Sequence, residues 1–251
     1  MSGAISSPHA QRTVVVTGAS SGIGLACARA FLELGDRVVA QYWTQPAPVA
    51  ALRGAFGAEQ VTPVEADLAR EEGCVSLIRA AGKAEVLVHS AGIWNDGPIR
   101  ELDARLLEEM FRTNTFSAYY LARETARSME RGCIVFIGST AGQRGEPGHS
   151  HYAGSKAALW GLVQSLGQEL APSIRVNLVS PGWVRTPMSE PTLAASGREA
   201  RIVATVPLAR IAEPEDVAAA VVFLADEARA RHLTGVDLPV SGGALLPLPR
   251  G

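Results

Sequence analysis

Lysine is nearly absent from this chain of 251 residues. Only Lys83 and Lys156 are lysines among its 23 cationic residues, and all the others are arginines. A bias in codon usage would be enough to produce this imbalance. It nevertheless makes any motif that requires a lysine easy to recognise, because only two positions can supply one.

A surplus of charge of either sign is also missing. The chain has 23 Lys and Arg against 25 Asp and Glu, so the net charge is -2, which excludes the basic surface expected of a protein that binds nucleic acid or an anionic membrane. With 47% hydrophobic and 19% charged residues, the chain is too apolar for a disordered protein. We therefore expect a globular protein whose partner is a small molecule.

Cysteines are few, and long apolar runs are missing. Cys27, Cys74 and Cys133 lie far apart without a CxxC pair, so we expect neither a disulfide framework nor a zinc site. The first eleven residues lack the basic and apolar segments of a signal peptide. Apolar stretches fall short of the about 18 residues that a membrane helix needs. These absences predict a cytoplasmic protein without a metal.

Short runs rich in valine and isoleucine alternate with longer helical patterns along the whole chain. Continuous apolar runs of this kind are typical of strands buried on both faces of a parallel sheet. Strands are predicted at 13–17, 37–42, 60–64, 85–89, 133–138, 174–180 and 235–240. Helices are predicted at 22–34, 47–57, 70–81, 103–129, 152–171 and 214–228.

The alternation predicts an α/β fold, a single doubly wound, seven-stranded parallel sheet with helices on both faces. One domain is expected over residues 1–251, with irregular tails at 1–11 and 244–251. The longest stretch without a predicted strand is 185–210. Long loops in compact domains are often lids or binding loops, so 187–207 is expected to be the substrate loop.

The segment TGASSGIG, residues 17–24, follows the first strand directly and begins the first helix. Gly18, Gly22 and Gly24 allow a tight turn and a close approach to phosphate groups, and the helix N-terminus offers N–H donors. Ser20 and Ser21 add hydroxyl donors. A plain turn between strand and helix is the alternative, but the position after the first strand favours dinucleotide binding.

The residue that reads the ribose should lie about 20 residues further on, which is Tyr42. An acidic residue there would select NAD(H), yet no carboxylate lies between Asp36 and Glu59. The sequence therefore favours NADP(H). Since no Arg or Lys follows Tyr42 directly, Ser21, Tyr42 and Thr44 would bind the 2′-phosphate through hydrogen bonds.

Asp67 follows the third predicted strand in the segment EADL. Its carboxylate is placed to accept a hydrogen bond from an adenine amino group. It is equally well placed to cap the N-terminus of the predicted helix 70–81. Both interpretations are open from the sequence.

Tyr152 and Lys156 lie four residues apart, on one face of a predicted helix. With four tyrosines in the chain, chance predicts about 0.03 such pairs for this composition. A cation one turn away favours the phenolate and brings a pKa near 10 closer to the working pH. Ser139, at the end of the fifth strand, could hold a carbonyl that Tyr152 protonates. Alternatively, Tyr152 and Lys156 are surface residues and Ser139 a loop residue.

These residues together resemble the short-chain dehydrogenase/reductase family over residues 10–245, and most closely its 3-oxoacyl-carrier-protein-reductase-like branch. The resemblance implies a single-domain Rossmann fold and hydride transfer between a nicotinamide and a carbonyl or secondary alcohol. It assigns catalysis to Asn114, Ser139, Tyr152 and Lys156. The cofactor contacts that it implies are Gly18, Ser20, Ser21, Gly22, Ile23, Gly24, Tyr42, Asp67, Leu68, Ala91, Gly92, Tyr152, Lys156, Pro181, Gly182, Val184 and Thr186.

The chain departs from the family pattern after the fourth strand. His89 and Ser90 replace two asparagines that brace neighbouring strands, whereas Ala91 and Gly92 are kept. We expect His89 to be a core histidine with its hydrogen bonds satisfied and not a catalyst. Ser241 stands where the family often has an aspartate.

The expected substrate pocket contains Trp94, Ser139, His149, Trp183 and Met188, although each aromatic could equally be ordinary packing. Family members are commonly homotetramers, and a homodimer is the alternative. In such assemblies the helix of Tyr152 packs on a partner subunit. The apolar run 157–170 suits this role, and a monomer's core could use it as well.

Two other functions compete with an NADP(H)-dependent carbonyl reductase. The fold could serve a non-catalytic regulator that senses NADP, or the same site could support a dehydratase or epimerase. Keeping all four catalytic residues argues against the regulator.

The scarcity of lysine also becomes informative, because a compact ammonium has to fit beside Tyr152, where a planar guanidinium has the wrong shape. Lys156 is thus expected to be required, and Lys83 is not.

Overall fold

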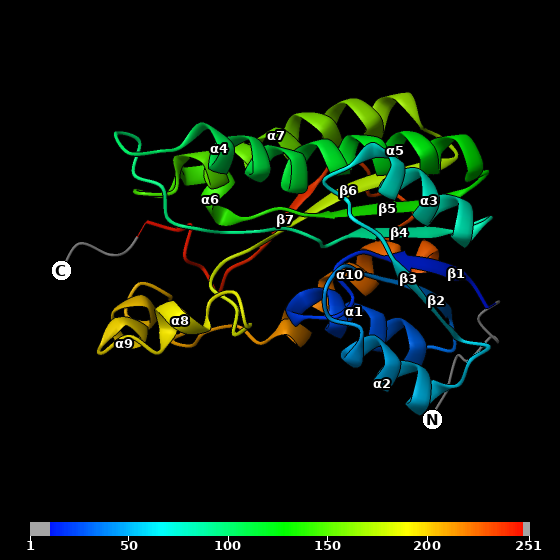
Figure 1. Ribbon diagram of the computed structural model, residues 1–251, viewed down its shortest axis with the longest axis horizontal. Coiled ribbons are helices and arrows are strands. Elements are labelled where there is room, and N and C mark those ends of the chain that lie inside the picture. The colour runs from blue at the N-terminus through cyan, green and yellow to red at the C-terminus, as the bar shows by residue number, and fades with distance from the viewer. Residues whose placement is uncertain (1–10, 248–251) are drawn as a thin grey trace.

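The computed structural model describes residues 11–247, so most of the two predicted tails lies outside the described residues. Its seven strands form one parallel sheet in the order β3-β2-β1-β4-β5-β6-β7 (Figure 1), which confirms the predicted fold class. The strands are β1 (Thr13–Val16), β2 (Arg37–Tyr42), β3 (Val61–Glu65), β4 (Val86–His89), β5 (Gly132–Ile137), β6 (Ile174–Pro181) and β7 (Asp237–Val240). The strand order reverses between β1 and β4, where the carboxyl ends of such a sheet form a ligand crevice.

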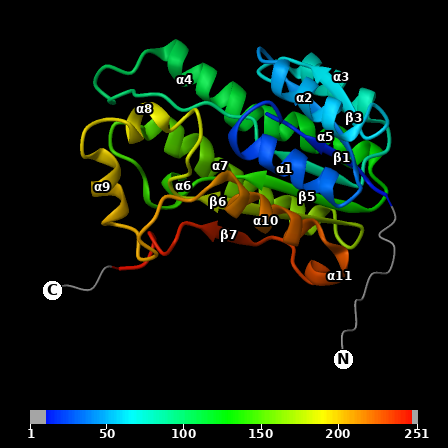
Figure 2. The same cartoon turned by 90° about the horizontal axis from the view of Figure 1, so that it is seen from below.

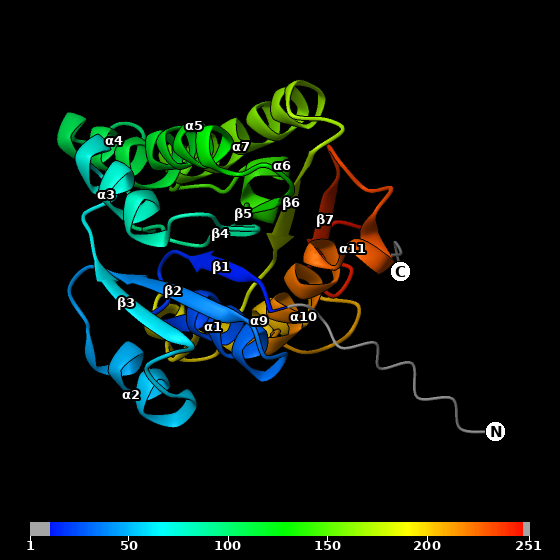
Figure 3. The same ribbon diagram turned by 90° about the vertical axis from the view of Figure 1, so that its right-hand side faces the viewer.

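Helices cover both faces of the sheet, as Figure 3 shows. One layer contains α1 (Gly22–Glu33), α2 (Ala47–Phe56) and α10 (Pro214–Ala225). The opposite layer contains α3 (Glu71–Ala81), α5 (Ser117–Ser128) and α7 (Ser150–Glu169). Each layer buries its own apolar cluster against the strands, because the strand side chains alternate between the two faces.

The predicted helix 103–129 is interrupted in the structure. It consists of α4 (Ala104–Phe111), a π-helical turn η1 (Arg112–Phe116) and α5. A π-turn inserts an extra residue into a helix and is often found at functional sites; this one contains Asn114. The apolar pattern continues through all three segments, so periodicity could not reveal the break.

Two more differences concern short helices. The predicted helix 214–228 ends at Ala225, and Asp226 then accepts hydrogen bonds from the N–H groups of Ala228 and Arg229 to begin α11 (Glu227–Ala230). Sequence periodicity also missed α6 (Thr140–Arg144), α8 (Glu190–Leu193) and α9 (Arg198–Val203). Each spans less than two turns, which is too short for a hydrophobic period to show.

The apolar run 157–170 serves mainly the core of this chain. Leu159, Leu162 and Val163 are buried against the sheet, while Trp160 is 41% exposed. The run is therefore explained without a partner subunit. Within residues 11–247, no helix combines the length and the apolarity needed to cross a membrane.

Candidate active site

A cavity of about 150 Å³ opens at the carboxyl ends of β4, β5 and β6. Figure 1 shows α4 and α6 on one side of this end of the sheet and α8 and α9 on the other. Twelve of the residues expected at the site line the cavity. They are Ile23, Gly92, Trp94, Ser139, Tyr152, Lys156, Pro181, Gly182, Trp183, Val184, Thr186 and Met188.

The three central residues reach the cavity from two neighbouring elements. Ser139 is the second residue after β5 and is the N-cap of α6, where its Oγ accepts a hydrogen bond of 3.1 Å from the N–H of Ala141. Tyr152 and Lys156 lie on successive turns at the beginning of α7. The structure thus brings together a hydroxyl, a phenol and an ammonium, as the sequence predicts.

Burial controls the protonation of this pair. Burial raises the pKa of Tyr152 to about 12, although a hydrogen bond with Ser139 opposes the rise. Burial also lowers the pKa of Lys156 to about 8. Burial acts on this phenol in the direction opposite to the one expected from Lys156, because an apolar environment disfavours the phenolate. Tyr152 is therefore set to hold its proton.

The position of Lys156 is fixed by the backbone of β5. Its Nζ donates a 2.9 Å hydrogen bond to the carbonyl oxygen of Ile137, and the residue is only 6% exposed. A Cβ on Gly92 would lie 3.3 Å from that Nζ and 3.1 Å from Oδ1 of Asn114. Gly92 therefore leaves room above the ammonium where a bound ribose could approach.

Asn114 is fully buried, and the π-turn directs its amide toward the end of β4. Oδ1 accepts a 2.8 Å hydrogen bond from the N–H of Ile93, and Nδ2 donates to the carbonyl oxygen of Ile93 at 2.9 Å. Nδ2 also lies 3.1 Å from Oγ of Ser155. Asn114 joins the loop after β4 to α7, and it does not line the cavity itself.

The glycine-rich turn has the geometry needed for close approach. Gly18 and Gly22 have φ values of 63° and 45°, a region that disfavours side chains. A Cβ on Gly24 would lie 2.2 Å from the carbonyl oxygen of Gly18, so α1 can pack against the turn only with glycine there. Ser21 is the N-cap of α1 but makes no side-chain capping bond.

Two polar residues that sequence reasoning missed hold this turn in place. Oε1 of Gln41 accepts a 2.8 Å hydrogen bond from the N–H of Gly18, and its Nε2 donates to the carbonyl oxygen of Ala66 at 2.7 Å. Oγ1 of Thr17 accepts from the N–H groups of Ser90 and Ala91, each at 3.0 Å. A buried polar residue inside an apolar strand run was the available signal for Gln41.

Tyr42 ends β2, as predicted. Asp36, the nearest preceding carboxylate in the sequence, is fully buried and pairs with Arg12 at 2.7 Å, so it is not available to a ribose. Tyr42 and Arg53 line one depression beside α2. No cation follows Tyr42 directly in the sequence, whereas in the structure Arg53 of the following helix lies near it.

The helix-cap interpretation of Asp67 is wrong. Its Oδ1 accepts a 3.0 Å hydrogen bond from the N–H of Ala69 in a local turn, and the N-cap of α3 is Arg70. The adenine interpretation stays a prediction. Leu68, which was expected to contact the cofactor, packs its side chain into the core and is 4% exposed, so only its backbone is available.

His89 is fully buried beneath the site. Its Nε2 lies 2.8 Å from Oγ of Ser117, whose hydroxyl donates to the carbonyl oxygen of Thr113 at 2.5 Å. Nε2 must therefore carry the proton. Burial, aided by the charge of Lys156, lowers the pKa of His89 to about 3, so the ring is neutral at working pH.

The expected role of His89 needs one correction. Its ring lies in the core and meets the ring of Phe136 on the neighbouring strand β5, with centroids 5.9 Å apart, and it also contacts Ser117 at the beginning of α5. Its hydrogen bonds, however, are not fully satisfied, since Nδ1 has no partner. Ser90, beside it, lines the cavity.

His149 does not line the cavity, contrary to expectation. Its ring stacks on Trp94 with centroids 4.5 Å apart and an interplanar angle of 10°. Trp94 does line the cavity, so the indole lies between the imidazole and the cavity. Trp183 meets Trp94 edge-on, with centroids 6.4 Å apart.

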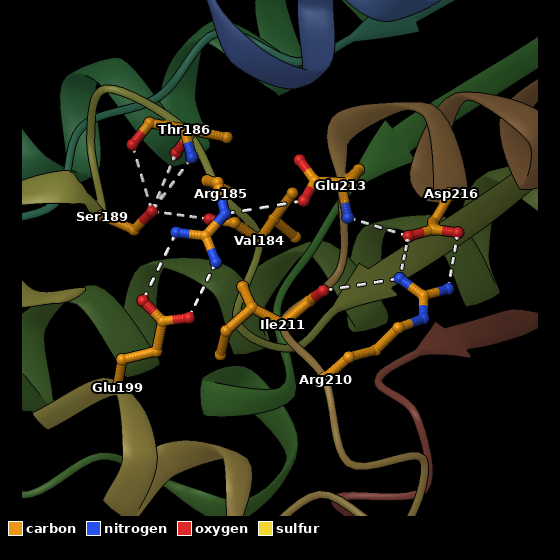
Figure 4. Close-up of polar contacts among 9 residues, drawn as sticks. All are labelled: Val184, Arg185, Thr186, Ser189, Glu199, Arg210, Ile211, Glu213 and Asp216. Carbon is orange, nitrogen blue, oxygen red and sulfur yellow. Dashed lines mark hydrogen bonds and ion pairs between the residues drawn. The ribbon is translucent and has the colours of Figure 1, made fainter.

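The loop after β6 carries a buried hydroxyl that the sequence did not single out. Oγ of Ser189 donates to the carbonyl oxygen of Val184 at 2.5 Å and accepts from the N–H of Thr186 at 3.1 Å. Figure 4 shows Ser189 at the centre of this turn. The turn fixes Val184 and Thr186 at the edge of the cavity.

The same loop is joined to its neighbours by ion pairs. Arg185 lies 2.8 Å from Glu199 in α9 and 3.5 Å from Glu213 at the beginning of α10 (Figure 4). Figure 2 shows α8 and α9 extending beyond the sheet at this end. All three side chains are about half exposed, at 40%, 43% and 52%. The predicted substrate loop 187–207 is thus two short helices held at their base.

No metal site is found in residues 11–247, where no three His, Cys, Asp or Glu side chains lie close enough together to hold an ion. The groups that converge on the cavity are those of proton transfer and of carbonyl binding.

Comparison with known proteins agrees with this geometry. Residues 18–244 match the family model described as enoyl-(acyl carrier protein) reductase. The chain is 36% identical over 239 residues to the 3-oxoacyl-[acyl-carrier-protein] reductase FabG of Rickettsia prowazekii, covering 94% of this chain and 97% of that protein. It is 35% identical over 252 residues to the L-rhamnose 1-dehydrogenase (NAD(P)(+)) of Azotobacter vinelandii, covering 94% and 98%.

Solved structures give the same result. A short-chain dehydrogenase/reductase from Brucella melitensis superposes with a TM-score of 0.89 at 30% identity, over 94% of this chain and 97% of that one. A putative NAD(P)-dependent gluconate 5-dehydrogenase from Beutenbergia cavernae, with bound NADP, superposes with a TM-score of 0.88 at 36% identity over the same shares.

Proposed function

Because this chain belongs to the short-chain dehydrogenase/reductase family and is a nicotinamide-dependent oxidoreductase, we propose that Tyr152 is the acid and base of its reaction. The observation that carries the proposal is the convergence of Ser139, Tyr152 and Lys156 on one cavity. The reaction exchanges a carbonyl for a secondary alcohol.

The site fits a nicotinamide dinucleotide. The glycine turn at Gly18 and the uncapped beginning of α1 suit a pyrophosphate, and the space over Gly92 suits a ribose beside Lys156. Val184 and Thr186 would hold the nicotinamide end. When bound, the cofactor supplies or accepts the hydride.

The chain itself supplies orientation and the proton. The Ser139 hydroxyl donates to the carbonyl oxygen and holds the carbonyl carbon toward the nicotinamide. As that carbon gains a hydride, its oxygen gains negative charge and takes the proton of Tyr152 Oη. The high pKa of the buried phenol keeps this proton available for reduction. Lys156 holds the ribose hydroxyls and stabilises the phenolate that is left.

We further propose a preference for NADP(H). Asp36, the nearest carboxylate before Tyr42 in the sequence, is buried with Arg12, and Arg53 lies beside Tyr42. Titration calorimetry should give NADPH an affinity about tenfold or more above that of NADH. Tyr42→Asp should reverse the order, because a carboxylate repels a phosphate. Tighter binding of NADH by the unmodified protein would contradict the preference.

The direct test of function is Tyr152→Phe, which removes one oxygen atom. Oxidation of NADPH by a panel of aldehydes and ketones should slow by about 100- to 10,000-fold. Tyr119→Phe is the matched control, because Tyr119 is 48% exposed on α5 and does not line the cavity; it should leave the rate unchanged. Unchanged turnover in Tyr152→Phe would refute the proposal.

The same assay separates the competing functions. A regulator would bind NADPH and oxidise none of it with any carbonyl in the panel. A dehydratase or epimerase would form product without net oxidation of the cofactor. The convergence of phenol, ammonium and hydroxyl favours the reductase over both.

We also propose that the protein is a cytoplasmic homotetramer. Phe116, Tyr119 and Trp160 expose between 41% and 48% of their surfaces on η1, α5 and α7, and an apolar group of this kind is typical of a subunit interface. Light scattering should give four times the mass of 26.4 kDa, and a monomeric mass would refute the assembly.

A further inference from the structure

Two indole rings line the cavity. They belong to Trp94 and Trp183, and Met188 lines the cavity as well. The two indoles meet at an interplanar angle of 76°, so they form a corner instead of a flat surface. A flat ring in such a corner can stack on one indole and meet the other edge-on, the two arrangements that aromatic rings prefer.

Trp94 is supported on the side away from the cavity. The ring of His149 stacks on it nearly parallel, at 4.5 Å, and does not line the cavity. The Nδ1 of His149 lies 3.1 Å from the carbonyl oxygen of Pro147, and its Nε2 lies 2.8 Å from Oδ1 of Asp96. Both neighbouring oxygens are acceptors and Nε2 makes no hydrogen bond, so a neutral imidazole is held through Nδ1 alone, and its stacking supports the plane of the indole.

The two loops that carry these rings are joined directly. The N–H of Gly97 donates to the carbonyl oxygen of Gly148 at 2.9 Å, and Nε2 of His151 donates to Oδ1 of Asn95 at 2.7 Å. A Cβ on Gly97 would lie 2.7 Å from Cε1 of His151, so the loops approach this closely only with glycine there. These contacts join residues 94–97 to residues 146–151, which end in the first turn of α7. Tyr152 is the next residue in the sequence.

The cavity also contains polar groups. Its charged side chains are those of Arg144, Glu146 and Lys156, and Lys156 already donates to the carbonyl oxygen of Ile137. The hydroxyl residues in its lining, besides Ser139 and Tyr152, are Ser90, Thr140, Thr186 and Ser189. A polyol carries a hydroxyl on nearly every carbon and needs a partner for each one that it buries. Indole faces and a thioether do not provide such partners.

We propose that Trp94, backed by His149, selects carbonyl substrates that bear an aromatic ring next to the carbonyl, such as aryl ketones. The proposal rests on the proposed function, since Ser139 and Tyr152 must hold the carbonyl. The oxygen lies against the catalytic pair, and the ring fills the corner between Trp94 and Trp183. Trp94 is thus a specificity-determining residue and takes no part in proton transfer.

Two ketones of matched shape test the selection. Acetophenone and cyclohexyl methyl ketone differ only in whether the ring is aromatic, and the saturated ring is the more hydrophobic of the two. Dissociation constants are measured by saturation-transfer NMR with the protein and its oxidised cofactor, so that no turnover is needed. Acetophenone should bind about three- to tenfold more tightly. Tighter binding of the saturated ketone would overturn the proposal.

Substitutions then test whether Trp94 is responsible for the preference for the aromatic ketone. Trp94→Leu should bring the ratio of the two dissociation constants close to one, while Trp160→Leu, at an exposed tryptophan outside the cavity, should leave it unchanged. Trp94→Phe keeps a ring and should retain most of the preference, which covers the case in which Trp94→Leu does not fold. A ratio unaffected by Trp94→Leu would overturn the assignment.

Failure of the proposed aryl selectivity and failure of the proposed function would give different results. If Tyr152→Phe remained fully active, the acid–base assignment would fail while the binding ratio still stood. If a polyol such as gluconate bound more tightly than either ketone, the aryl class would fail while the reductase chemistry still stood. In steady-state assays Trp94→Leu should raise KM for acetophenone and leave kcat nearly unchanged, because Trp94 contributes to binding and not to the chemical step.

Discussion

The two sides of the cavity are held by different kinds of contact. On the inner side, Lys156 and Asn114 bond to the backbone at Ile137 and Ile93, and both are buried. On the outer side, the loop of α8 and α9 is fixed at its base through Arg185 and Glu199, whose side chains are about half exposed.

The two kinds of contact hold the two sides of the cavity with different firmness. Backbone carbonyls at strand ends are fixed by the sheet itself, so groups bonded to them keep their positions. Exposed ion pairs contribute about 0–1 kcal/mol each and are weakened by salt. The inner side is therefore suited to proton transfer, and the outer side can open for the substrate at little cost. Four substitutions or conditions test this contrast.

The largest effect is expected for Lys156→Arg. The guanidinium is wider than the ammonium, and Lys156 is enclosed between Gly92 and the end of β5, so kcat/KM should fall about 100-fold, within the range for a displaced proton-transfer group. Lys83→Arg is the control, because Lys83 is 79% exposed and pairs with an exposed Glu130. Equal losses in both variants would contradict the inference that only one lysine is required.

The pH dependence of kcat/KM should follow the protonation of Lys156, on the inner side of the cavity. The pKa of Lys156 is lowered to about 8, so its ammonium predominates below that pH and is lost above it. In the proposed mechanism the charged form would hold the ribose and stabilise the phenolate, so kcat/KM for reduction should be level below pH 8 and fall about tenfold per unit above it. The residual activity of Lys156→Arg should lack this fall; a fall that persists would assign it to another group.

A smaller effect on stability is expected from His89. Its pKa is about 3 in the folded protein and 6.5 ordinarily, so between these values the unfolded chain binds the additional proton. The free energy of unfolding should therefore decrease by about 1.4 kcal/mol per unit as the pH falls through this window. Urea titrations of His89→Asn should show a shallower slope than those of the unmodified protein. Parallel slopes would show that the buried ring is not responsible.

The smallest effect is expected for a substitution on the outer side of the cavity. Arg185→Ala removes both ion pairs at the base of the loop, and at this exposure the loss should be no more than about 1 kcal/mol. We expect KM to rise no more than about fivefold, with kcat unchanged, and 0.5 M salt to reduce the difference between variant and unmodified protein. A large loss of kcat would mean that the loop also positions the reacting groups.

Much of the fold follows from local sequence patterns. The seven strands lie within a residue or two of their predicted positions, because each is a short, mostly apolar run. The five inner strands are buried along most of their length, whereas the edge strands β3 and β7 are partly exposed. The π-turn inside 103–129 could not be predicted, since its apolar spacing matches that of a continuous helix. The short helices α8 and α9 were hidden for a related reason, because neither is long enough to display a period.

The candidate site divides in the same way. Ser139, Tyr152 and Lys156 were recognisable from residue type and spacing, and the structure places them on one cavity. The spacing did not reveal that His149 stacks on Trp94 or that His89 contacts Ser117. It also did not reveal that the N-cap of α3 is Arg70 and not Asp67. Each of these depends on the direction of a side chain relative to a segment distant in the sequence.

The sequence by itself determined the order of strands and helices along the chain, and it predicts the phosphate-binding turn and the one lysine that the proposed chemistry requires. These are local properties: hydrophobic period, glycine position and residue spacing along one helix. Only the tertiary structure decided which protonation states these groups prefer and which rings form the substrate wall. Burial sets a pKa, and packing between loops sets the orientation of a ring, and neither is defined until distant segments meet.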